Sequence, residues 1–126
     1  MKRLLALVLV AVSFTSLAQN VGLDPVVTPS LFRYNDQITV SYDVTGTSLA
    51  SLSTAWIWVW IPGTTINARY NFNPASSNTA QTDNAKFTKS VVNGKTLFTI
   101  TFKPSDFFAS DISAQQKLGM LLKGND

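Results

Sequence analysis

The sequence predicts an all-β fold, an antiparallel sandwich of two sheets, from three observations. After the first segment of the chain, apolar and polar residues alternate with the period of two that is typical of half-buried strands. Asn93-Gly94 stands between two such segments, and this is the strongest short-range hairpin signal because type I′ turns need positive φ at both central residues. About six short strands follow one another at regular spacing, with turn residues between them.

The first segment differs from the rest. Lys2 and Arg3 give a positive start, residues 4–14 form an apolar run of eleven, and small residues stand at Ser16 and Ala18. This pattern is typical of a secretory signal peptide cleaved after Ala18. The run is far shorter than the ~20 residues of a membrane-spanning helix, which argues against a membrane anchor.

We therefore predict a signal peptide over residues 1–18 and one sandwich module over residues 19–126. The chain is expected to be exported through the inner membrane, to the periplasm, the cell surface or the medium. No transmembrane span is expected in the mature chain.

The composition excludes most kinds of catalytic site. The chain has no His and no Cys, so it cannot build a Ser-His-Asp or Cys-His nucleophilic site, a zinc site of the usual type or a disulfide. All seven acidic residues are Asp. Without the predicted signal peptide, the chain has eight basic residues and these seven acidic ones, a net charge of +1. This balance gives no basic patch for nucleic acid. We expect no enzyme, no cofactor and no metal site.

Six strands are expected along the chain. They are predicted over residues 26–28, 37–44, 54–61, 85–92, 95–103 and 117–123. The first precedes Pro29 and is expected at a sheet edge, where proline is tolerated. In the second, Ile38, Val40, Tyr42 and Val44 share one face, and the intervening polar residues share the other.

The remaining elements follow from similar signals. Pro62-Gly63 stops the third strand, and Asn93-Gly94 joins the fourth to the fifth. Residues 104–108 are expected to form a helical turn that packs Phe107 and Phe108 under the sheet. This element order predicts an immunoglobulin-like sandwich, a fold that takes about 100 residues.

Two features strain this fold. Residues 64–84 form a long connection rich in Asn, Ser, Thr and Ala, and connections of that length are usually functional or mobile. The chain also ends directly after an apolar strand, whose edge a further strand normally covers. We therefore expect a sandwich that lacks its last strand, either a C-terminally truncated module or the first of several.

The third strand is apolar on both faces. Trp56, Trp58 and Trp60 point to one side, and Ile57 and Val59 point to the other. A strand in a two-layer sandwich has only one face in the core. Three aromatic side chains offer about 450–750 Å² of apolar surface, whereas the largest patch on a typical monomer is roughly 300–600 Å². The indole face is therefore not expected to stand fully bare.

Three arrangements of the indoles remain open. They fill the core, with Ile57 and Val59 half exposed; or residues 64–84 or a neighbouring domain cover them; or they form a ligand platform. A platform suggests sugar, because alternate strand residues lie roughly 6.6–6.8 Å apart and flat indoles at that spacing stack under successive sugar rings. Tyr70 and Asn71 would then supply hydrogen bonds to hydroxyls.

Other polar residues are weaker candidates. Asp106 and Asp111 flank the Phe107-Phe108 turn, and oxygen ligands suit calcium, but the sequence has no Asp-x-Asp loop and no Glu. We interpret Asp106 as the cap of a helical turn and Asp111 as solvated. Lys86 and Lys89 stand on opposite faces of a strand and are interpreted as solvated charges.

Six parts of the chain carry a resemblance to known modules: Val27-Thr28-Pro29-Ser30-Leu31-Phe32, residues 38–44, residues 56–61, Asn73-Pro74-Ala75, residues 93–98 and residues 119–126. Together they resemble repeated immunoglobulin-like modules in exported proteins of glycan-degrading Gram-negative bacteria. The families concerned are SusE-like starch-binding surface proteins and multidomain proteins secreted by the type IX system. The chain departs from SusE-like proteins in having no lipoprotein Cys, and it lacks the Trp and closing strand that usually follow. The resemblance implies no catalytic residue.

The sequence thus leads to two hypotheses about function. The first is a non-catalytic exported module that binds or presents a polysaccharide or oligosaccharide as part of a larger cell-surface or secreted protein. Its glycan-binding residues would be Trp56, Trp58, Trp60, Tyr70 and Asn71. The alternative is a structural spacer without a ligand, whose tryptophans contact its own core or neighbouring modules of the same protein.

Overall fold

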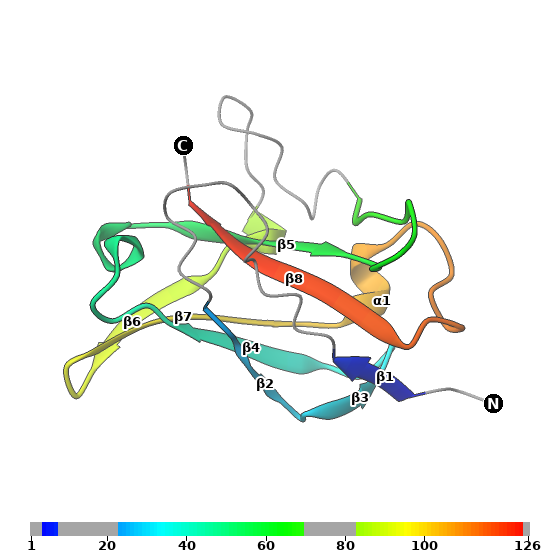
Figure 1. Ribbon diagram of the computed structural model, residues 1–126, viewed down its shortest axis with the longest axis horizontal. Coiled ribbons are helices and arrows are strands. Elements are labelled where there is room, and N and C mark those ends of the chain that lie inside the picture. Colours follow the sequence, from blue (N-terminus) through cyan, green and yellow to red (C-terminus); the bar gives the residue numbers. More distant parts are fainter. Residues whose placement is uncertain (1–3, 8–22, 70–82, 125–126) are drawn as a thin grey trace.

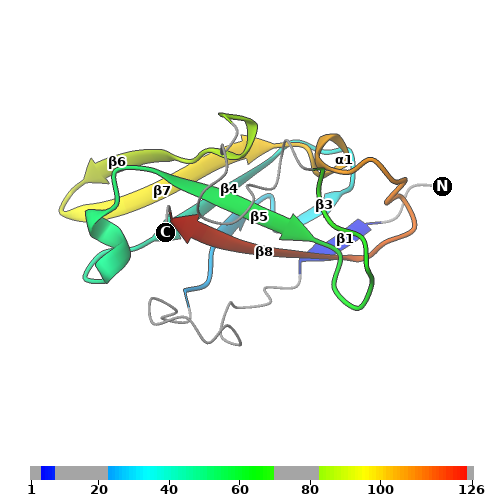
Figure 2. The same ribbon diagram turned by 90° about the horizontal axis from the view of Figure 1, so that it is seen from above.

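The chain folds as a two-layer, all-β sandwich, as predicted (Figure 1). The computed structural model describes residues 4–7, 23–69 and 83–124. One sheet has the strand order β3-β1-β8-β5 and the other the order β2-β4-β7-β6. Figure 2 shows the two layers from above. The strands are β1 (Leu4–Leu7), β2 (Val26–Thr28), β3 (Leu31–Arg33), β4 (Ile38–Asp43), β5 (Ala55–Trp60), β6 (Thr88–Val92), β7 (Lys95–Phe102) and β8 (Lys117–Gly124).

The sheet β2-β4-β7-β6 follows the predicted alternation. Ile38, Val40 and Tyr42 of β4 are buried, and the hydroxyls between them face outward. Thr39 pairs with Thr101 of β7, and their Oγ1 atoms are 2.9 Å apart. β2 lies at the edge of this sheet, as its proline-flanked sequence predicts.

The β6–β7 hairpin has the predicted turn. Asn93 has φ of 50° and Gly94 has φ of 77°, so both central residues are in the left-handed region. A type I′ turn matches the right-handed twist of the flanking strands, which explains why Asn-Gly selects it.

Aromatic side chains join the two sheets at one side of the sandwich. Phe87 lies beside β5, where its amide donates to the Ala55 carbonyl (2.9 Å). Its ring contacts Tyr42 (centroids 5.7 Å apart) and Phe98 (6.1 Å), which belong to the other sheet. Burial, and secondarily the charge of Asp24, raise the pKa of the Tyr42 hydroxyl. The core therefore lies between Phe87 and these two rings.

A short helix, α1 (Pro104–Phe107), closes the sandwich after β7. Phe107 and Phe108 are buried, as predicted, and Phe107 packs on Phe102 with ring centroids 4.4 Å apart. The cap assignment was wrong: the N-cap is Lys103, without a side-chain cap bond, and Asp106 lies inside the first turn. Proline at the first helical position fixes the start of this turn.

Two strands have no predicted counterpart. β3 has only three residues, too few for a period-two alternation to be recognised, whereas the equally short β2 was predicted from the proline that follows it. β1 lies inside the predicted signal peptide and pairs antiparallel with β3 and parallel with β8. A short apolar segment fits a strand or a helix equally well by composition alone. Cleavage after Ala18 stays a prediction.

Lys89 departs from the solvated position expected for it. Its Nζ donates to the carbonyls of Ala50 (2.9 Å) and Leu52 (2.7 Å) and lies 5.9 Å from the centroid of the Phe98 ring. The interpretation of Lys89 as a free surface charge was therefore wrong. Lys86, in contrast, is exposed.

Candidate functional site

The tryptophan strand presents its indoles on the outer face of its sheet. Ile57 and Val59 are fully buried and share one face of β5 with Ala55. The Phe87 amide donates to the Ala55 carbonyl, and the Phe87 ring contacts Tyr42 of the opposite sheet. This face of β5 is therefore the core side. The arrangement in which the indoles fill the space between the sheets, with Ile57 and Val59 half exposed, is therefore wrong. The separation of the two faces is as predicted.

The three indoles differ in exposure. Trp56 is only 8% exposed, whereas Trp58 and Trp60 are half-buried. The short turn η3 (Asp83–Ala85) packs against β5, and a bridge joins Trp56 to Lys86 at the edge of β5 that faces away from β8. Nε1 of Trp56 is buried without a hydrogen-bond partner. Trp56 is thus a covered residue, and the open part of the row is Trp58 and Trp60.

Trp60 lies flat on the neighbouring strand. It pairs with Gly119 of β8 across the antiparallel ladder. A Cβ atom at position 119 would stand 2.7 Å from Cζ2 and 2.8 Å from Cδ2 of the indole, so the ring occupies the space of the missing side chain. One face of this indole therefore rests on the β8 backbone, and the opposite face is turned outward.

Lysines frame the indole row. Lys123 of β8 stands opposite Trp56 of β5 in the ladder. Its Nζ lies 5.5 Å from the centroid of the Trp58 ring, a cation–π contact. Lys117 lies at an outward register position of β8, because it has the same strand parity as Lys123. Lys86 flanks Trp56 at the other edge. Within the described parts of β5 and β8, no outward register position holds a carboxylate.

We name this surface the indole face and define it by Trp56, Trp58, Trp60, Gly119, Leu121, Lys123 and Lys86. Its β8 and edge residues were missed by the sequence analysis. The alternation Lys117-x-Gly119-x-Leu121-x-Lys123 is a sequence signal for the β8 side of the indole face, because it puts these four residues on one side of the strand. What was missing was the pairing of β8 with β5, which only the fold supplies.

Tyr70 and Asn71 lie outside the described residues. The segment before them runs along the edge of β5 that faces away from β8, since the Ala68 amide donates to the Val59 carbonyl (3.2 Å) and the Ile61 amide to the Ile66 carbonyl (3.0 Å). The Arg69 amide donates to the Phe107 carbonyl (2.7 Å). A contribution of Tyr70 and Asn71 to the indole face stays a prediction.

No family model, no curated protein and no solved structure matches the chain.

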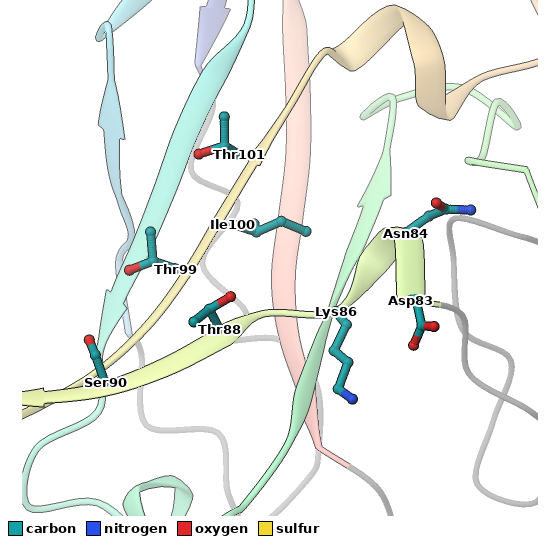
Figure 3. A pocket seen from close by; sticks show the side chains of 8 residues that line it. All are labelled: Asp83, Asn84, Lys86, Thr88, Ser90, Thr99, Ile100 and Thr101. Carbon is teal, nitrogen blue, oxygen red and sulfur yellow. The ribbon is translucent and has the colours of Figure 1, made fainter.

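A second, polar hollow lies where β6 separates from the edge of β7 (Figure 3). Asp83, Asn84 and Lys86 line one side of it. The rest of its lining is Thr88, Ser90, Thr99, Ile100 and Thr101, mostly hydroxyl groups. Because Lys86 also flanks Trp56, the hollow adjoins the indole face.

The aspartates at the α1 end of the sandwich do not form a site. Asp106 and Asp111 are both exposed, and the Asp111 carboxylate accepts the Ser113 amide (2.8 Å), which lowers its pKa. Among the described residues, no group of three or more His, Cys, Asp or Glu is placed to hold a metal ion. None of the described helices is long and apolar enough to cross a bilayer.

Proposed function

We propose that this chain is a non-catalytic module that binds glycan on its indole face. The observation that carries the proposal is the flat Trp60 indole, seated on Gly119 with one face turned outward. An aromatic ring buries a large apolar area on contact, and the apolar face of a sugar ring is a flat surface that can stack on it. Trp58, two residues earlier on the same face, extends the platform by about 6.6–6.8 Å.

The lysines around the row favour an acidic glycan within this class. Lys86 and Lys123 flank Trp56, and Lys117 lies further along β8, so a chain laid along the indoles would run past ammonium groups. Uronate carboxylates or sulfates would be attracted to these charges, and this attraction would weaken with salt. Neutral glucans and xylans would stack on the same indoles without this contribution.

The proposal includes a setting for the module. The leader-like first segment and the resemblance to modules of glycan-degrading bacteria support export and membership in a larger cell-surface or secreted protein. Such a protein would use the module to hold glycan close to the cell or to a partner domain.

A spacer without a ligand is the second candidate, and one observation favours it. Trp56 is already covered within the chain, as a core residue would be, and the half-buried indoles beside it would suit contact with another module. In that case Trp58 and Trp60 would contact protein rather than sugar.

Glycan titration separates the two candidates. The full chain is titrated with polygalacturonate, xylan and starch while its tryptophan fluorescence is recorded. We expect a response that is strongest for polygalacturonate and declines between low and high salt. Trp60→Ala and Trp58→Ala should each weaken binding about tenfold or more while the chain stays folded, as expected for central aromatic anchors.

The matched control is Val91→Ala, because Val91 is 67% exposed on β6, in the other sheet. This variant should bind like the unmodified chain. A folded chain that responds to none of the three glycans would reject the proposal and leave the spacer.

A further inference from the structure

β1 is a central strand of the sheet β3-β1-β8-β5. β1 lies between β3 and β8, pairing antiparallel with the first and parallel with the second. Among the described strands, β3 has no other partner in this sheet. β1 therefore supplies the whole connection between β3 and the rest of its layer.

Loss of β1 would leave an unfilled strand position. The backbone N–H and C=O groups that β3 and β8 direct toward β1 would lose their partners, and unpaired strand edges readily recruit another strand. The adjacent core is fully closed in the present arrangement: Phe32, opposite position 5, and Leu118, opposite position 7, are both completely buried. An empty position would expose the edge beside both of these side chains.

We propose that this position is a strand-acceptor site that binds an extended segment of a partner polypeptide after the leader is removed. The inference rests on the predicted cleavage after Ala18 and is independent of the glycan proposal. The incoming strand would run antiparallel to β3 and parallel to β8, as β1 does. Main-chain hydrogen bonds would supply affinity, and alternate side chains would supply specificity.

The register defines the chemistry of the partner. Positions equivalent to 5 and 7 stand opposite the buried Phe32 and Leu118 and call for apolar residues. Position 4 stands opposite the exposed Arg33 of β3, and position 6 stands between Leu31 of β3 and the exposed Lys117 of β8. Acidic side chains at positions 4 and 6 would be attracted to these two positive charges. The partner is therefore an extended segment in which apolar residues alternate with acidic ones.

Blocking β1 in the full chain tests this site. The chain is made without export, so that the leader is retained, and carries Leu5→Pro, which removes a ladder hydrogen bond from a central strand. The probe is a labelled peptide of alternating Leu and Glu. We expect it to bind the Leu5→Pro chain at least tenfold more tightly than the unmodified chain. Equal binding to both chains, or no binding to a folded Leu5→Pro chain, overturns the proposal.

Two controls make the result specific. The same peptide with N-methyl groups at alternate amides cannot complete the ladder and should not bind. A peptide of identical composition in which the leucines and glutamates are not alternated should bind at least tenfold more weakly than the probe. Binding of either peptide as tightly as the probe contradicts a strand-acceptor site.

A second measurement does not depend on the folding of the proline variant. Ala6→Cys with Leu31→Cys places two thiols at directly opposed positions of β1 and β3, within the separation that a disulfide bridges. The chain has no cysteine of its own. The disulfide should form in the full chain, and Ala6→Cys with Val91→Cys should form none.

Absence of the Ala6–Leu31 disulfide means that β1 does not occupy the position, which overturns the proposal. Intact mass of the exported protein gives the last check. A chain that begins at Gln19 supports a vacated position, and one that still begins at Met1 contradicts it.

Discussion

Gly119 lies beneath the indole of Trp60, and the lack of a side chain there lets the ring lie flat on β8. Gly119→Ala should destabilise the chain by about 1–3 kcal/mol, because the added methyl group would force the indole off its seat. Urea unfolding of the two proteins measures this difference.

A double-mutant cycle tests whether the cost comes from this contact. In the Trp60→Ala background, Gly119→Ala should cost much less, since the ring that it displaces is gone. If the cost is equal in both backgrounds, Trp60 does not rest on Gly119 in solution, and the flat platform is lost with it.

For single residues of β5, the sequence predicts which side of the strand each side chain lies on, but not which side faces the core. Strict alternation placed Trp56, Trp58 and Trp60 on one side of β5 and their Ile and Val neighbours on the other, and the structure agrees. It did not reveal which side is the core, because both sides are apolar. Phe87 settles that point, since its ring reaches Tyr42 and Phe98 of the opposite sheet.

Among the elements, the end of β4 is fixed by a local polar turn. The Asp43 carboxylate accepts the Thr45 hydroxyl (2.6 Å) and the Thr45 amide (3.0 Å), and the Thr45 hydroxyl in turn accepts the Thr96 amide (2.9 Å). The Thr45 hydroxyl contributes most to lowering the pKa of Asp43, followed by the Thr45 amide, and the charge of Lys95 adds to it.

This lowered pKa predicts a pH dependence with a definite sign. The turn stabilises the fold above the ordinary aspartate pKa of about 3.9, and this contribution is lost as the pH falls through the lower pKa of the folded state. The unfolding free energy of Asp43→Asn should therefore change less steeply below about pH 4 than that of the unmodified chain. Acid titration of urea unfolding measures the two slopes.

Variants of Thr45 provide the control for the pH effect. Thr45→Val removes the hydroxyl donor and should raise the Asp43 pKa toward its ordinary value, whereas Thr45→Ser keeps the donor and the low pKa. Carboxyl-carbon NMR reports this pKa directly. An Asp43 pKa that is the same in both variants would assign the shift to other groups.

The elements that sequence predicts well are those whose signal is local. The β6–β7 hairpin was predicted because Asn93-Gly94 carries its turn geometry within two residues. β8 was predicted as an apolar strand, but its pairing with β5 depends on contacts far apart in the sequence. β3 is too short for periodicity, and β1 has a composition that fits a leader as well as a strand.

For the molecule as a whole, Lys89 ties one sheet to the connection that leads into the other. The short turn η2 (Ser48–Ser51) lies between β4 of one sheet and β5 of the other. The Lys89 ammonium, from β6, donates to the carbonyl of Ala50 in this turn and to the carbonyl of Leu52 just after it. The same ammonium lies over the Phe98 ring of the core. These contacts close the end of the sandwich at which β6 and β7 turn back.

Lys89→Met should destabilise the whole chain by about 1–3 kcal/mol, because hydrogen bonds to a charged donor contribute about that much and the two carbonyls would lose their partner. Methionine keeps the apolar stem over Phe98, so the loss reports mainly the ammonium. Urea unfolding followed by tryptophan fluorescence and by circular dichroism should give coincident transitions, since the two sheets are expected to unfold as one unit.

The matched control is Lys86→Met, an exposed lysine three residues earlier, whose substitution should change stability by less than about 0.5 kcal/mol. If Lys89→Met unfolds at the same urea concentration as Lys86→Met, the ammonium does not join the two layers, and the sandwich is held at this end by apolar contacts alone.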